Sequence, residues 1–144
     1  MRTDPLNRLP QLRRHLLCWT CGLTMLAIAG HSEAAAQAKG LSGYWRGSGF
    51  ISPAKGQRER VRCRVWISQS ARQSYRVKAR CASQAVDIDQ TGSVRRTGRN
   101  NYTGEFFNSD FNIRGRLRIT LRGNRQSVSL QSDAGSGHLT LFRR

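Results

Sequence analysis

The stretch Arg60–Ile67 reads RVRCRVWI, with an apolar side chain or a cysteine at every odd position and arginine or tryptophan at every even position. The stretch Tyr75–Cys81 reads YRVKARC and repeats this alternation after a polar segment at 68–74. Strict alternation of apolar and polar side chains is typical of a β-strand with one buried face. Two such strands joined by a short polar segment predict an antiparallel β-hairpin.

The two cysteines of this hairpin, Cys63 and Cys81, predict its register. If they are bonded as directly opposed residues, Val65 faces Ala79 and the apolar side chains of both strands point the same way. Opposed residues of an antiparallel pair have β-carbons about 4.5–5.5 Å apart, near the separation that a cross-strand disulfide requires. A slip of one residue would turn the apolar set of one strand outward. The alternation and the disulfide therefore predict the same pairing.

The rest of the chain repeats this pattern in short segments separated by glycines and polar turns. Further strands are expected at 43–51, 86–90, 93–97, 102–107, 113–122, 127–130 and 138–141. No amphipathic helical periodicity appears after residue 38. About eight short antiparallel strands predict an all-β fold. Because closure removes exposed sheet edges, we expect an up-and-down barrel or a strongly curved meander sheet.

The first 38 residues predict an N-terminal signal helix, and 39–144 a single basic β-barrel-like domain. Four arginines precede an uncharged apolar run at 16–30, and small residues follow at 34–38. This order is typical of a secretory signal peptide. The protein is therefore expected to be periplasmic or secreted, a location in which a disulfide is stable. An uncleaved inner-membrane signal anchor is the alternative, and both the general and the twin-arginine export routes stay open.

The chain is strongly basic, with 25 Lys and Arg against 8 Asp and Glu and a formal net charge of +17. Such an excess favours polyanionic partners, although arginine-rich surfaces also serve solubility alone. The predicted anion-binding face consists of the outward positions Arg62, Arg64, Trp66, Arg76, Lys78, Arg80, Arg114, Arg116 and Arg118. For an exported protein, the expected partner is an anionic envelope component: a lipid head group, lipopolysaccharide or an acidic glycan. Nucleic acid is disfavoured.

The region 39–144 offers little for catalysis. His138 is its one imidazole, and a structural or surface role is favoured for it because no cysteine is left as a nucleophile. Asp87 and Asp89 share a strand face, where we expect them to pair with arginines rather than hold a metal. No phosphate-binding loop is present, since Gly47–Gly49 leads into an apolar strand. We expect no enzymatic activity, no metal and no cofactor.

The sequence Gly43-Tyr44-Trp45 resembles the Gly-x-Trp opening of lipocalin-like and avidin-like barrels. This resemblance implies that Trp45 plugs one end of a barrel. A longer pattern is similar to a group of small exported alphaproteobacterial β proteins of unassigned role, and it implies a compartment and a fold but no activity. Its segments are Trp45–Gly49, Glu59–Cys63 and Arg80–Ser83.

Two functions follow from these observations. The first is a non-enzymatic binding or envelope-associated protein whose basic outer face contacts an anionic envelope component. The alternative is a lipocalin-like carrier that holds a small apolar ligand in the barrel interior. Against the alternative, the inward apolar side chains of so small a domain are expected to fill the barrel. An inhibitor of lysozyme is disfavoured because the common lysozymes are themselves basic.

Overall fold

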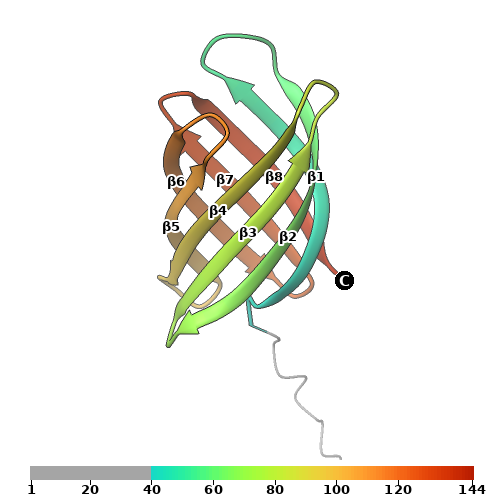
Figure 1. Ribbon diagram of the computed structural model, residues 1–144. Helices are drawn as coiled ribbons and strands as arrows, with labels where there is room; N and C mark the ends of the chain where they lie inside the picture. Colours follow the sequence, from blue (N-terminus) through green and yellow to red (C-terminus); the bar gives the residue numbers. More distant parts are fainter. Residues whose placement is uncertain (1–39) are drawn as a thin grey trace, which may run out of the picture. The chain divides into compact units, whose positions relative to one another are not determined.

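The computed structural model describes residues 40–144, so the predicted signal segment lies outside the described residues. The described chain forms a closed antiparallel barrel in which each strand pairs with the next and β8 pairs with β1 (Figure 1). The strands are β1 (Gly43–Pro53), β2 (Glu59–Ala71), β3 (Ser74–Ala82), β4 (Asp87–Arg96), β5 (Asn101–Asn108), β6 (Ile113–Arg122), β7 (Arg125–Ser132) and β8 (Gly135–Arg143). The all-β fold is confirmed. Of the two expected forms, the structure has the closed up-and-down barrel and not the open, curved sheet. Among residues 40–144, no helix is long and apolar enough to cross a membrane.

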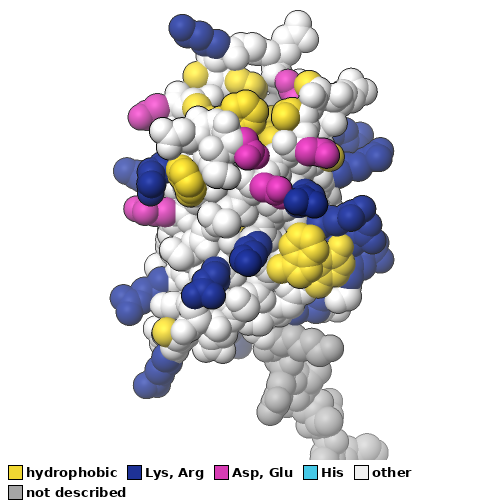
Figure 2. Space-filling view, viewed as in Figure 1, with side chains coloured by type: hydrophobic (Ala, Val, Ile, Leu, Met, Phe, Trp, Pro, Cys, Tyr) yellow, Lys and Arg dark blue, Asp and Glu magenta, His cyan; other side chains and the backbone are white. Residues whose placement is uncertain are grey.

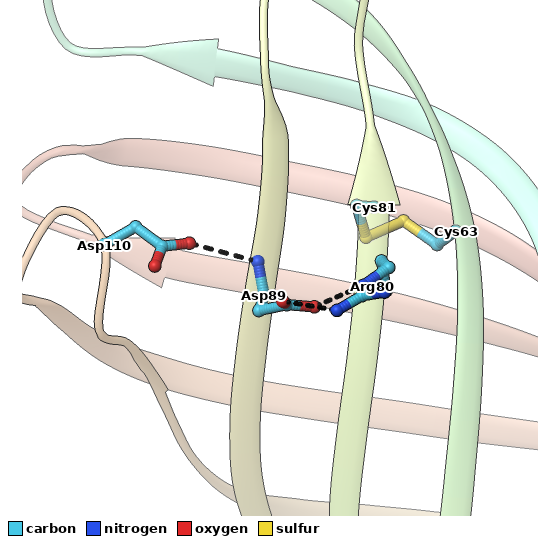
Figure 3. A network of polar contacts seen from close by, with 5 residues as sticks. All are labelled: Cys63, Arg80, Cys81, Asp89 and Asp110. Atoms are coloured by element: carbon cyan, nitrogen blue, oxygen red, sulfur yellow. Dashed lines mark hydrogen bonds and ion pairs between the residues drawn. A yellow bond between two sulfur atoms is a disulfide. The ribbon is translucent and has the colours of Figure 1, made fainter.

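The hairpin of β2 and β3 has the register that its sequence predicts. Cys63 lies opposite Cys81 and Val65 opposite Ala79, and the two sulfurs are bonded at 2.04 Å. The register shifts between Gln69 and the turn, where a bulge precedes the chain reversal. The disulfide prediction is therefore confirmed, and the bond ties two neighbouring strands of the barrel wall (Figure 3).

One expected boundary is wrong, because the segments 86–90 and 93–97 form the single strand β4. Thr91 and Gly92 look like a turn in the sequence, yet the β4 ladder with β3 and β5 runs through both of them. A β-carbon at Gly92 would lie 3.3 Å from the Leu117 side chain and 2.8 Å from the Glu105 carbonyl oxygen. Glycine is therefore explained here by close packing rather than by a change of chain direction.

The seam between β1 and β8 closes the barrel and depends on two glycines. Gly47 and Gly49 lie opposite Leu141 and Leu139. A β-carbon at Gly47 would overlap the carbonyl oxygen of Thr140, and one at Gly49 would overlap the carbonyl oxygen of the residue before Leu139. The absence of side chains lets β1 coil tightly against β8, as barrels of small diameter require.

The barrel has one closed end, formed around Trp45, which is fully buried. The indole Nε1–H donates to the carbonyl of Leu41 at 3.1 Å, and the guanidinium of Arg143 lies 4.2 Å from the centre of the ring. Arg143 also donates to the carbonyls of Ser42 and Gly40, each at 2.6 Å, and burial lowers its pKa. Three residues of the entering chain and the end of the last strand are thereby fixed around one indole.

We predict that Gly49→Ala destabilises the barrel, because the added methyl group must push β1 away from β8. The expected loss of unfolding free energy is about 1–3 kcal/mol, as for other overpacked sites. Ser48→Ala is the matched control, because Ser48 points outward opposite Arg62 and its substitution should change little. Urea denaturation followed by circular dichroism measures both variants. Equal stability of Gly49→Ala and the wild type would contradict the close approach at the seam.

Candidate functional site

The end of the barrel opposite Trp45 is open and contains an apolar cavity of about 310 Å³. Its walls come from the end of β1, the start of β4, the end of β5, the start of β6 and the loops between them. The large apolar lining residues are Ile51, Pro53, Val86, Ile88, Phe106, Phe111, Ile113 and Leu130. Glu59, Gln90 and Asn108 add polar groups to the wall. Clefts with mainly apolar walls and a few polar groups are typical small-molecule sites. We call this cavity the mouth.

Two apolar side chains stand exposed at the rim of the mouth. Phe111 is 53% exposed and Val86 is 37% exposed. The Phe111 N–H donates to Oδ1 of the buried Asn108 at 3.0 Å, which fixes the loop between β5 and β6. The Val86 N–H donates to the Ser83 hydroxyl at 3.1 Å, which fixes the loop between β3 and β4. The rim is thus held in place although it exposes apolar surface to water.

The interior beneath the mouth is filled by side chains. The enclosed cavity there has a volume of about 30 Å³, which is room for one or two water molecules but no organic ligand. Gln126 borders this cavity, is fully buried, and finds no hydrogen-bond partner within the described protein for either atom of its amide. The interior is therefore filled, as expected for so small a domain, and the space for a ligand is at the mouth rather than in the barrel interior where the carrier alternative placed it.

The predicted anion-binding face is divided between two parts of the barrel. Its residues on β2 and β3 lie side by side, whereas those on β6 are separated from them by β4 and β5. The first group comprises Arg62, Arg64, Trp66, Arg76, Lys78 and Arg80, and the second Arg114, Arg116 and Arg118. Arg76 lines one surface hollow with Arg114 and Arg116, across β4 and β5. The other residues form two separate basic strips on the wall.

The strip on β2 and β3 continues onto β1 through Arg46, which lies opposite Arg64. Arg64 in turn lies opposite Arg80, whose guanidinium binds both oxygens of Asp89 at 2.8 and 2.9 Å. This hydrogen bonding raises the pKa of Arg80 and lowers that of Asp89. The Asp89 N–H also donates to the carboxylate of Asp110 at 3.2 Å (Figure 3). Arg80–Asp89 is the one ion pair among residues 40–144, so Arg46 and Arg64 stay without a carboxylate.

An aromatic pair borders this strip. Trp66 is 48% exposed and packs against Tyr44, with the ring centres 5.2 Å apart and the planes tilted by 36°. Figure 2 shows a hydrophobic cluster next to Lys and Arg side chains on the visible face of the barrel. The pairing of β1 with β2 brings Tyr44 and Arg46 to this site. Sequence reasoning missed both, although the alternation of the first strand indicates their outward direction.

The titratable residues that the sequence singles out lie on different strands, with Asp87 and Asp89 on β4 and His138 on β8. His138 is exposed on β8, where its cross-strand neighbours are Phe50 and Ser129. No three His, Cys, Asp or Glu side chains lie close enough to hold a metal among residues 40–144. Of the two aspartates expected to pair with arginines, Asp89 does so, whereas Asp87 makes no ion pair among residues 40–144.

Charge is distributed unevenly along the barrel axis. The acidic residues of the described chain are concentrated toward the open end, and Figure 2 shows acidic side chains only in its upper half. They are Glu59, Asp87, Asp89, Asp110 and Asp133, with Glu105 near the middle of β5. The strand ends and turns around the closed end carry arginines and no Asp or Glu. These arginines are Arg72, Arg95, Arg96, Arg99, Arg122, Arg125, Arg143 and Arg144.

The solved structures that resemble this chain include designed β-barrels. A redesigned β-barrel, mFAP1, bound to DFHBI matches with a TM-score of 0.59 and 13% identity over 72% of this chain and 94% of its own. A de novo designed fluorescence-activating β-barrel matches with a TM-score of 0.57 and 19% identity over 74% of this chain and 95% of its own. At these identities the likeness shows the fold, which is compatible with a lipocalin-like barrel. No family model matches the sequence, and no curated protein sequence matches it significantly.

We predict that Gln126→Leu stabilises the protein, because leucine removes a buried amide that lacks protein partners. Such unpaired groups cost about 1–3 kcal/mol each, so we expect a gain of about 1 kcal/mol in unfolding free energy. Gln131→Leu is the matched control, since Gln131 lies on the same strand but is exposed. The measurement is the urea midpoint of each variant. A lower midpoint for Gln126→Leu than for the wild type would show that the amide is satisfied in solution.

Proposed function

We propose that this protein binds a small apolar molecule at the mouth of its barrel and acts as a carrier for it. The observation that supports this function most directly is the apolar cavity of about 310 Å³ at the open end, with Phe111 and Val86 exposed at its rim. Exposed apolar groups around a concave site gain free energy when a ligand removes them from water. A barrel of similar fold, mFAP1, was solved bound to DFHBI, which supports a binding role for this architecture.

The walls of the mouth also indicate which ligands fit. Its volume is at the lower end of the roughly 300–1,000 Å³ that is typical of ligand pockets, so the ligand is small. Glu59 contributes to the wall, and Asp87 and Asp110 lie in or beside the loops of the same end. Lys55 and Arg58 lie in the β1–β2 loop of this end, so the rim carries both signs of charge. The proposed ligand is therefore neutral, and Gln90 and Asn108 lie in the wall where they can hydrogen-bond to it.

We predict that the neutral probe N-phenyl-1-naphthylamine binds saturably and that Phe111→Ser weakens its binding about tenfold, since burying a phenyl group contributes about 1.5–3 kcal/mol. Phe142→Ser is the matched control, because Phe142 is 50% exposed but lies on β8 near the closed end. Titration followed by probe fluorescence measures both dissociation constants. Equal weakening by the two substitutions, or an absence of saturable binding, would exclude the mouth as the site.

A second candidate function is contact between the outer wall and an anionic envelope component, which we propose for the strip formed by Arg46, Arg62 and Arg64 with Tyr44 and Trp66. The supporting observation is that Arg46 and Arg64 lie directly opposite each other across β1 and β2 and that neither is paired with a carboxylate within residues 40–144. Like charges directly opposed on a sheet cost up to about 1 kcal/mol, and a bound anion would remove this cost. Guanidinium groups fit phosphate and carboxylate, and an exposed aromatic pair offers a face for sugar rings. The envelope location itself depends on the predicted export signal.

We predict that the triple substitution of Arg46, Arg62 and Arg64 by serine lowers the salt concentration at which the protein elutes from heparin. Substitution of Arg114, Arg116 and Arg118 by serine removes the same charge from β6 and should lower it less. The expected difference arises because salt dependence reports the number of contacts with the polyanion. Equal elution of the two triple variants would mean that net charge alone governs retention.

A further inference from the structure

The closed end of the barrel presents a ring of exposed arginines on its turns. Arg72 lies in the turn between β2 and β3, Arg99 in the turn between β4 and β5, and Arg122 and Arg125 flank the turn between β6 and β7. Arg144 follows β8 at the same end. We call these five residues the closed-end ring. Every turn at this end therefore projects at least one guanidinium group.

The closed-end ring is not neutralised within the described chain. Its turns and strand ends contain no Asp or Glu, and Arg122 lies directly opposite Arg125 across β6 and β7, an arrangement of like charges that destabilises a sheet. Two neighbouring arginines have structural roles instead. Arg96 donates to the carbonyls of Gly98 and Arg99, and Arg143 covers Trp45. The side chains of the ring residues thus make no ion pair within residues 40–144, which favours an external anion as their partner.

The path of the chain indicates which anion this is. The described chain begins at Gly40, and its carbonyl accepts a hydrogen bond from Arg143 at the closed end. The apolar run at 16–30, which the sequence predicts to enter a membrane during export, is joined to Gly40 by the residues between 30 and 40. A fully extended connection of this length spans only about 35 Å. In the uncleaved anchor form, a bilayer that holds the apolar run is therefore tethered to the barrel through Gly40, where the described chain begins.

We propose that the closed-end ring docks the barrel onto an anionic lipid surface, with the mouth directed away from it. Guanidinium groups bind lipid phosphates by paired hydrogen bonds, and each arginine near an anionic bilayer strengthens binding about fivefold. The carboxylates at the other end, such as Asp87, Asp110 and Asp133, are repelled by the same surface. The open end carries both signs, because Lys55 and Arg58 lie in its β1–β2 loop, whereas the turns of the closed end carry arginines and no carboxylate, so the closed end is the one that an anionic surface attracts more strongly. This docking is additional to ligand binding and does not depend on it.

The test is the partition of the full chain onto vesicles of phosphatidylglycerol mixed with phosphatidylcholine, measured by co-sedimentation. Vesicles of phosphatidylcholine alone report any binding by the N-terminal apolar run, so the ratio of the two partition coefficients measures the charged contact. The docking variant replaces Arg72, Arg99, Arg122 and Arg125 by serine. The matched control variant removes the same charge from the barrel wall by replacing the exposed Arg60, Arg114, Arg116 and Arg118 by serine.

We expect the ratio to fall about 600-fold for the docking variant and only a few-fold for the control. Equal loss in the two variants would overturn the proposal in favour of unspecific charge attraction, and a larger loss in the control would assign the contact to the wall.

N-phenyl-1-naphthylamine binding provides a check of folding in each variant. Should that probe fail to bind the wild type, the mouth proposal fails while the vesicle result still decides the docking. The double variant Arg122→Ser/Arg125→Ser, which relieves a like-charge pair, tests the same point if the fourfold variant does not fold, with an expected loss of about 25-fold.

Discussion

The main-chain ladder between β1 and β8 is the constraint on which this barrel depends. It joins the first and last strands of the domain, which lie far apart in the sequence. Every other pairing is a hairpin between strands that are neighbours in the sequence. The ladder requires Gly47 and Gly49, because a side chain at either position would occupy the space of the β8 backbone. Once closed, the sheet has no unpaired edge, and its inner face is packed with aliphatic side chains.

The two ends of the closed sheet differ in packing and charge, and the proposed activities follow this difference. Trp45 and Arg143 fill one end, whereas the other end keeps an apolar cavity. The carboxylates of the described chain gather toward the open end, where Lys55 and Arg58 also lie, whereas the turns of the closed end carry arginines and no carboxylate. A ligand and an anionic surface would therefore meet opposite ends of the molecule, and neither would obstruct the other.

Much of the fold is readable from the sequence because strand alternation and a disulfide constrain the same register. The pairing of Cys63 with Cys81 follows from residues within one hairpin, where no distant contact is needed. Gly92 misleads for the opposite reason, since its role is set by Leu117 on a strand that is far away in the sequence. The mouth and the uneven distribution of charge along the barrel axis also cannot be predicted from any single stretch of the sequence. They depend on which end of each strand reaches which rim, and alternation reports only the inward or outward direction of a side chain.

The seam has a consequence for when the protein can fold. Residues 135–143 are the last part of the domain to be synthesised, and they supply both the partner of β1 and the guanidinium group that covers Trp45. A nascent chain that lacks them has two open edges and an uncovered indole, and contacts of such large sequence separation form slowly. The barrel therefore cannot close until β8 has been synthesised, which leaves an interval in which the first strand has no partner on its outer edge and the polypeptide is still open.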